Sequence, residues 1–323
     1  MQAVRQLSEE AYLSRPQLYG GFGGFSRDGK AFFARSQRQR LNLVSIFQCL
    51  LLPWGLFCLV YAATSFQIHY LNPSLCYILC ALGLVVVIGS GVLALQSVVR
   101  RIQADQAREP RWYVFLFLTM LVGWIVGVVL GNLNFWTNMQ PYYNYMNLNM
   151  YHDVNPATMR GQQLMDAGLV YFTNGTGLDL RRSMGFRNLD TYCVAPISVK
   201  GAGTLLPLSS YDFWAVGLGC CSGNAADFHC SQFDNKRAHS GLRLLKDEQR
   251  PFFRLAVQQA ESAYSIKARH PLFFYWGEDP AVQMNSFRDE GYKYYLIGML
   301  AHFAWQLLAV GLAASGFSKI GTH

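Results

Sequence analysis

Charged residues are scarce in this chain, and four stretches have none. Asp, Glu, Lys and Arg make up only 14% of the 323 residues, whereas 52% are hydrophobic, which departs from the composition of soluble proteins. No Asp, Glu, Lys or Arg occurs in residues 43–66, 75–99, 112–133 and 295–317. Each stretch exceeds the roughly 20 residues that a helix needs to cross about 30 Å of hydrocarbon. Buried helices of a soluble protein, with apolar runs of about 10 to 14 residues, are the weaker alternative, and four transmembrane helices are predicted.

The chain also lacks the short motifs that identify common active sites. The long connection between the third and fourth stretches contains no GxSxG, HExxH or P-loop pattern. His229 beside Cys230 suggests zinc, but the paired-ligand spacing of zinc sites is missing. No catalytic residue, metal site or cofactor is therefore predicted. The basic residues accompany no recognisable nucleic-acid-binding fold, so nucleic acid is not expected as a partner.

The distribution of charge predicts which way the protein faces. Residues 1–41 hold seven Lys and Arg against three acids, the connection 100–111 holds four against two, and the connection 67–74 holds none. By the positive-inside rule, both termini are cytosolic and residues 134–294 are extracytosolic. The expected order is a cytosolic arm (1–41), three transmembrane helices (42–133), the extracytosolic domain (134–294), and the fourth helix with a short cytosolic tail (295–323). Residues 1–40 contain no apolar stretch of signal-peptide length, so we expect the first span to direct insertion.

The extracytosolic segment carries the features of a secreted domain. Asn174-Gly175-Thr176 is a sequon for N-glycosylation, and an even set of cysteines, Cys193, Cys220, Cys221 and Cys230, is available for up to two disulfides. Adjacent cysteines pair poorly with each other, so Cys220 and Cys221 are each expected to reach Cys193 or Cys230, in an order that stays open. These features predict a multi-pass membrane protein of the secretory pathway or the plasma membrane.

Short apolar segments separated by Gly, Asn and Pro predict strands at residues 168–172, 191–199 and 212–221, and an aromatic strand after Pro271. Residues 247–266 change to a helical pattern. The residues expected near one face of that helix are Phe252, Leu255, Ala256, Gln259, Ala260 and Ala263. The fold class predicted for this segment is therefore α+β.

Two patterns inside the spans concern helix packing and transport. Gly123, Gly127 and Gly131 recur every four residues, which favours a packing face for another helix of this chain or for a second copy. Gly89 and Gly311 are candidate partners. His302 and Gln306 share a face of the fourth span, where they either bond neighbouring helices or form an intramembrane polar site.

The four spans, the dominant loop after the third, and Cys220-Cys221 in that loop together resemble the tetraspanin family. That resemblance implies a scaffold that clusters membrane partners, and it carries over Cys220 and Cys221 as disulfide formers. A serine, Ser222, interrupts the family's Cys-Cys-Gly motif, and Cys193 lies upstream of the pair. Much of the loop also resembles a group of multi-span protist membrane proteins, through the segments MDAGLVYF, NLDTYCVAP, FWAVGLGCC and HPLFFYWGEDP.

Three functional hypotheses follow. The first is a non-enzymatic membrane scaffold whose outer domain recognises a partner. Its expected partners are the lipid bilayer and other membrane proteins or further copies of the chain. The second is a transporter or channel subunit that uses His302 and Gln306. The third is an ectoenzyme, for which no residue is assigned.

Overall fold

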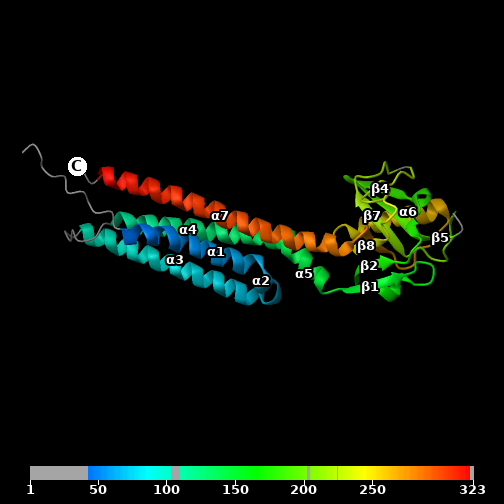
Figure 1. The fold of residues 1–323 in the computed structure, drawn as a ribbon, viewed down its shortest axis with the longest axis horizontal. Helices are drawn as coiled ribbons and strands as arrows, with labels where there is room; N and C mark the ends of the chain where they lie inside the picture. The colour runs from blue at the N-terminus through cyan, green and yellow to red at the C-terminus, as the bar shows by residue number, and fades with distance from the viewer. Residues whose placement is uncertain (1–42, 103–109, 202–203, 224, 321–323) are drawn as a thin grey trace, which may run out of the picture. The chain divides into compact units, whose positions relative to one another are not determined.

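The computed structural model describes residues 43–102, 110–201, 204–223 and 225–320 (Figure 1). The predicted N-terminal arm, residues 1–41, lies outside this part. Four helical segments among the described residues are long and apolar enough to cross a membrane: α1 (Leu43–Ser65), α3 (Pro73–Ile102), Pro110–Met146 and α7 (Pro280–Ile320). Two disulfides and a β-sheet lie between the third and fourth of them. The chain is thus a multi-pass membrane protein with a disulfide-bonded, β-containing region on an oxidising side.

Two of the helices run further than their apolar stretches. The third continues from α4 (Pro110–Asn134) through a π-helical turn (Phe135–Met139) into α5 (Gln140–Met146), and α7 begins 15 residues before position 295. These extensions are rich in Asn, Tyr and charged residues, which an aqueous helix tolerates and a search for apolar runs does not detect. Residues 134–146, which the sequence assigned to the extracytosolic domain, continue the third helix.

Helices α1 and α4 form the centre of the bundle. Their mutual contact is the most extensive between any two described elements; α3 packs mainly on α4, and α7 mainly on α1. A five-residue helix, α2 (Gln67–Leu71), joins α1 to α3. The central pair therefore determines how the two outer helices are placed.

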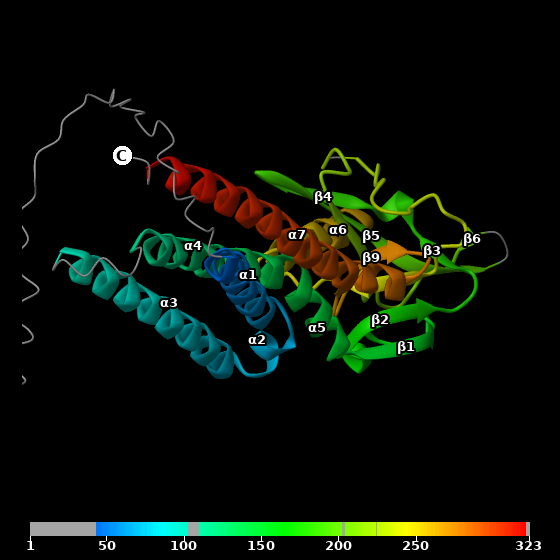
Figure 2. The same ribbon diagram turned by 60° about the vertical axis from the view of Figure 1, so that its left-hand side comes forward.

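The segment from Asn147 to Asp279, here called the sheet domain, is built on one mixed sheet (Figures 1 and 2). Its strand order is β1-β2-β8-β9-β7-β5-β3, with β4 and β6 also paired to β5. The pairs β1–β2 and β7–β9 are parallel and the others antiparallel. The strands are β1 (Asn149–Val154), β2 (Ala167–Phe172), β3 (Thr176–Leu178), β4 (Met184–Asn188), β5 (Asp190–Gly201), β6 (Thr204–Leu205), β7 (Phe213–Leu218), β8 (Ser240–Arg243) and β9 (Leu272–Gly277).

Both faces of the central strands are buried. In β7, Phe213 and Ala215 belong to one hydrophobic cluster, and Trp214 and Val216 belong to the other. Helix α6 (Arg250–Tyr264) covers the second cluster. Strands buried on both faces appear as continuous apolar runs, which is why β2, β5, β7 and β9 could be predicted from sequence.

The residues expected near one face of α6 are only partly buried. The helix buries Phe253, Ala256, Val257 and Ala260, whereas Leu255 is 40% exposed and Gln259 and Ala263 are exposed. Ala and Gln give little contrast between faces, so the pattern alone fitted two faces about one residue apart. Phe252, which was expected on the same face, is half-buried and stacks on Tyr192 at 4.8 Å between ring centroids.

Candidate functional site

The four cysteines of the sheet domain form two disulfides. Cys193 of β5 bonds to Cys221, and Cys220 bonds to Cys230, with sequence separations of 28 and 10 residues. Each of the adjacent cysteines thus has a different partner. Cys193 and Cys230 belong to the first hydrophobic cluster, so both bonds fasten the segment after β7 to the core. The sulfur atoms of Cys193, Cys220 and Cys230 lie within 4.8 Å of one another, but disulfide-bonded sulfur supplies no thiolate to a metal.

Asn174 lies in the exposed turn between β2 and β3. The next residue, Gly175, has φ of +87°, a backbone conformation that favours glycine. The amide side chain of the sequon is therefore accessible from solvent.

The glycine repeat of α4 faces α1. A Cβ atom would lie 3.1 Å from the Pro53 carbonyl oxygen at Gly123 and 3.2 Å from the Phe57 carbonyl oxygen at Gly127. At Gly131 it would overlap the Thr64 hydroxyl. Close approach of the two backbones thus requires all three glycines.

The two glycines expected to receive this repeat do not do so. No atom of the described chain, outside the immediate neighbours, lies within 4 Å of a Cβ built on Gly89 of α3 or Gly311 of α7. Helix α1 instead presents backbone carbonyl groups to α4.

Side chains donate to backbone carbonyl groups along the interface of α1 with α7. The Trp54 indole N–H donates to Met299 at 3.1 Å, and the Gln306 amide donates to Cys49 at 2.6 Å. Two tyrosines do the same: Tyr61 bonds to Tyr294, and Tyr295 bonds to Cys58. Hydrogen bonds from side chains therefore hold the outer helix to the centre of the bundle.

His302 lies in the same interface without such a bond. Its ring stacks on Phe57 at 4.1 Å between centroids and 4° between planes, beside Gly123. The residue is buried, and neither ring nitrogen has a hydrogen-bond partner among the described residues. His302 and Gln306 both face α1, where Gln306 forms a hydrogen bond and His302 forms a ring stack.

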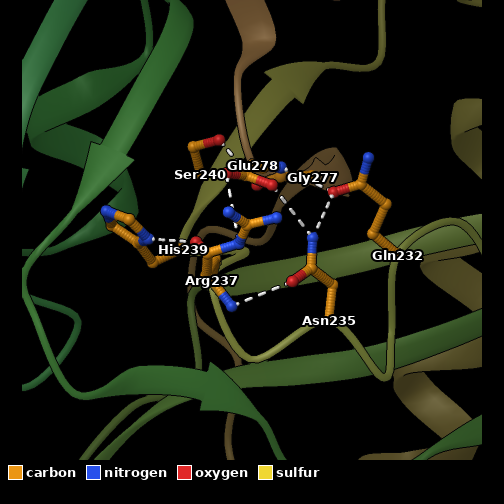
Figure 3. A network of polar contacts seen from close by, with 7 residues as sticks. All are labelled: Gln232, Asn235, Arg237, His239, Ser240, Gly277 and Glu278. Atoms are coloured by element: carbon orange, nitrogen blue, oxygen red, sulfur yellow. Dashed lines mark hydrogen bonds and ion pairs between the residues drawn. The ribbon is translucent and has the colours of Figure 1, made fainter.

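A polar network holds the loop before β8 against the end of β9 (Figure 3). The Asn235 amide donates to Gln232 at 3.1 Å and to Glu278 at 3.2 Å, and Arg237 forms an ion pair with Glu278 at 3.5 Å. The Arg237 side chain is 81% exposed. These groups bond to one another and to the backbone, so the network has a structural role in fixing the loop.

A cationic cavity on the sheet domain was not detected in the sequence. Its volume is about 600 Å³, and it lies between the end of β8, the first turns of α6 and the segment before β9. Four arginines contribute to its wall: Arg243, Arg250, Arg254 and Arg269. Among the lining residues Asp247 alone is acidic, and it pairs with Arg250 at 2.8 Å. The cavity therefore carries an excess of positive charge.

Arg243 is the most buried member of this group. It is 9% exposed, and its Nη1 atom has no hydrogen-bond partner in the described part of the chain. Its guanidinium lies 5.7 Å from the centre of the Phe274 ring on the neighbouring strand. Burial, with a contribution from the nearby Arg250 charge, lowers the pKa of Arg243 to about 10. The side chain thus stays positively charged at neutral pH without a carboxylate partner.

Asp212 holds the segment that carries Arg269 and His270 through hydrogen bonds to its backbone. The Asp212 carboxylate accepts hydrogen bonds from the N–H of Arg269 at 3.1 Å and the N–H of His270 at 3.3 Å. It also accepts from the Ser210 hydroxyl at 2.6 Å and from the N–H of Gly161 at 3.0 Å. Burial raises the pKa of Asp212, but the combined effect of these hydrogen bonds lowers it by more, so the net shift of the pKa is downward. The backbone that carries Arg269 and His270 is therefore fixed in position.

A local charge imbalance was the available signal for this cavity. Between residues 243 and 270 there are six Lys and Arg against three acids, although the whole connection from 134 to 294 is almost balanced. Sequence alone does not bring the strand end, the helix start and the later segment together.

Comparison with protein-family models, with curated proteins and with solved structures finds no match to this chain. The tetraspanin resemblance therefore stays an interpretation of topology and of one cysteine pair.

Proposed function

We propose that this protein is a membrane scaffold that presents the sheet domain, as a partner-binding module, in a fixed position on its transmembrane helices. The observation that carries the proposal is the junction between helices and sheet. Tyr145, at the end of the third helical segment, packs in one hydrophobic cluster with Leu169 of β2, Leu242 of β8 and Met284 of α7. Its hydroxyl donates to the backbone carbonyl of Arg243 at 2.7 Å.

The junction supports this role because it leaves no free linker at either connection. Asn134 bridges the two helices that enter the domain, since its amide donates to the carbonyl of Gly291 at 3.0 Å. Phe287 of α7 packs against the same cluster as Tyr145. A module held by two helices keeps its orientation relative to the bundle, as an organiser of other membrane proteins requires.

The proposal includes an orientation. Both termini are cytosolic and the sheet domain is extracytosolic, as the charge distribution favours. Asn174 in its exposed turn is then glycosylated, and removal of N-glycans from the protein made in its own cells shifts its mobility on a gel. Asn174→Gln abolishes that shift; an unchanged mobility of the wild-type protein on deglycosylation argues against this orientation.

The scaffold role is tested by cross-linking in native membranes. The full-length protein is cross-linked, purified in a mild detergent and mapped by mass spectrometry. We expect a second protein in stoichiometric amount, with cross-links that map to residues 149–277. Preparations that contain only lipid, or only copies of this chain, contradict the proposal.

A transporter or channel subunit is the second candidate, and one observation favours it. His302 is buried among the helices without a hydrogen-bond partner among the described residues, as a group that binds a transported species would be. Flux of protons or monovalent cations into proteoliposomes tests it. A flux that falls with His302→Phe supports the transporter, and an absence of flux removes it.

A further inference from the structure

The cationic cavity has more positive charge than the acidic residue in its wall can neutralise. Of its four arginines, Arg250 pairs with Asp247, and Arg254 donates to the Ala268 carbonyl at 3.3 Å. Arg243 has a buried nitrogen with no partner among the described residues. A buried guanidinium nitrogen without a hydrogen bond is costly, and a bound anion would supply an acceptor for it.

The position of helix α6 strengthens the argument. The N-terminal end of an α-helix carries a partial positive charge and favours anions. The first turn of α6 instead contains Arg250, with Arg254 one turn later, and no acidic residue. Asp247, which precedes the helix, offsets part of this charge through its ion pair with Arg250, and a bound anion would offset the remainder.

The size of the cavity indicates what carries the anion. A volume of about 600 Å³ lies within the range of small-molecule sites, roughly 300–1,000 Å³. Leu272 and Phe273 are buried in its wall, and Pro271 lies beside them. Planar guanidinium groups bind phosphate and sulfate oxygens in pairs, which suits a site built from arginine rather than lysine.

We propose that this cavity binds a small molecule through a phosphate or sulfate group, with Arg243, Arg250 and Arg254 as its cationic ligands. The inference goes beyond the scaffold role, which requires no small ligand. Arg243 holds the group at the base of the cavity, and the exposed Arg250 closes on it from the rim. The apolar wall then contacts the remainder of the ligand.

The test is direct binding to the full-length protein in detergent. Equilibrium dialysis measures the dissociation constants of inorganic phosphate, inorganic sulfate and glucose 6-phosphate. Arg243→Met retains much of the apolar stem, and the double variant Arg250→Gln with Arg254→Gln changes only the rim, in case the buried substitution impairs folding. Arg237→Gln is the matched control, because Arg237 forms a surface ion pair with Glu278 as Arg250 does with Asp247.

We expect saturable binding, weakened about tenfold or more in Arg243→Met and in the rim variant, since each lost charge-assisted hydrogen bond has at least that effect. Arg237→Gln should bind like the wild-type protein. Tighter binding of glucose 6-phosphate than of phosphate assigns the group to a larger molecule, and equal binding assigns it to the free anion. No saturable binding of any of the three probes, or an equal loss in Arg237→Gln, overturns the proposal. Cross-links to the sheet domain that survive in the rim variant would leave the scaffold role intact even then.

Discussion

The membrane helices and the sheet domain solve the same packing problem with opposite means. At the interface of α1 with α4, the contact depends on what is missing: Gly123, Gly127 and Gly131 have no side chains, so backbones meet. In the sheet domain the contact depends on what is present, with aromatic side chains on both faces of β7 and two covalent cross-links. In lipid, apolar contact gives helices no advantage over lipid tails, whereas in water it is the main driving force.

Similar substitutions should therefore affect the stability of the two regions differently. Added volume should be most damaging in the bundle, and lost cross-links or lost charge most damaging in the sheet domain.

Gly127→Leu should disrupt the bundle. A leucine side chain has no room beside the Phe57 carbonyl oxygen, so α1 and α4 must separate, at a cost that exceeds about 3 kcal/mol. Size-exclusion chromatography in mild detergent should show loss of the monodisperse protein. Gly311→Leu is the control and should change little, because no described atom outside the surrounding helix backbone and the chain neighbours lies within 4 Å of a Cβ built there. Equal effects of the two variants would refute the assignment of the glycine face to α1.

Removal of each disulfide should destabilise the sheet domain by a different amount. By chain entropy, the 28-residue separation of Cys193 and Cys221 corresponds to about 3.5 kcal/mol, and the 10-residue separation of Cys220 and Cys230 to about 2.5 kcal/mol. Paired Cys→Ser variants, compared by denaturant unfolding of the domain, measure this difference. The glycine-packed bundle should be insensitive to reductant; a bundle that dissociates on reduction breaks the comparison.

Asp212→Asn should destabilise the sheet domain by about 2 kcal/mol, because several donors lose a charged acceptor. Since the folded-state pKa of Asp212 is below its ordinary value, its stabilising contribution is present above about pH 4 and is lost as pH falls through the folded-state value. Thermal unfolding across acidic pH should show this loss in the wild-type protein. Asp234→Asn, at an exposed aspartate, should retain the wild-type pH dependence.

Two substitutions in α7 should have the smallest effects on stability. Gln306→Leu removes the bond to the Cys49 carbonyl and should cost about 0.6 kcal/mol, the average for such bonds in membranes. His302→Phe removes two buried nitrogens without partners among the described residues while keeping the stack on Phe57, so stability should be unchanged or slightly raised. Thermal unfolding in one detergent compares them. A clear loss of stability in His302→Phe would mean that the ring has a bonding role.

The sequence predicted the parts of the fold that depend on long or two-sided apolar runs. The four spans and strands β2, β5, β7 and β9 belong to this group. Strands such as β1, with only Val154 buried, and the four-residue β8 lack such runs and were missed. Their formation depends on pairing with β2 and β9, which is tertiary information.

The candidate sites divide in the same way. The cysteines and the glycine repeat were identified because residue type and spacing alone indicate disulfides and a helix-packing face. The partner of the glycines could not be identified, because α1 offers backbone carbonyl groups, which every residue has. The cavity depends on Arg243, Arg254 and Arg269 coming together from three elements, and no local pattern encodes that meeting.

The length of α7 has a consequence for what the protein can reach. Its 41 residues correspond to about 60 Å at 1.5 Å per residue, roughly twice the thickness of the hydrocarbon layer. With residues 295–317 in the lipid, the charged part from Pro280 to Tyr294 stands about 20 Å clear of it. The helix thus holds the near end of the sheet domain at a fixed distance from the hydrocarbon layer. The proposed partner of the sheet domain must therefore extend at least about 20 Å beyond the hydrocarbon layer.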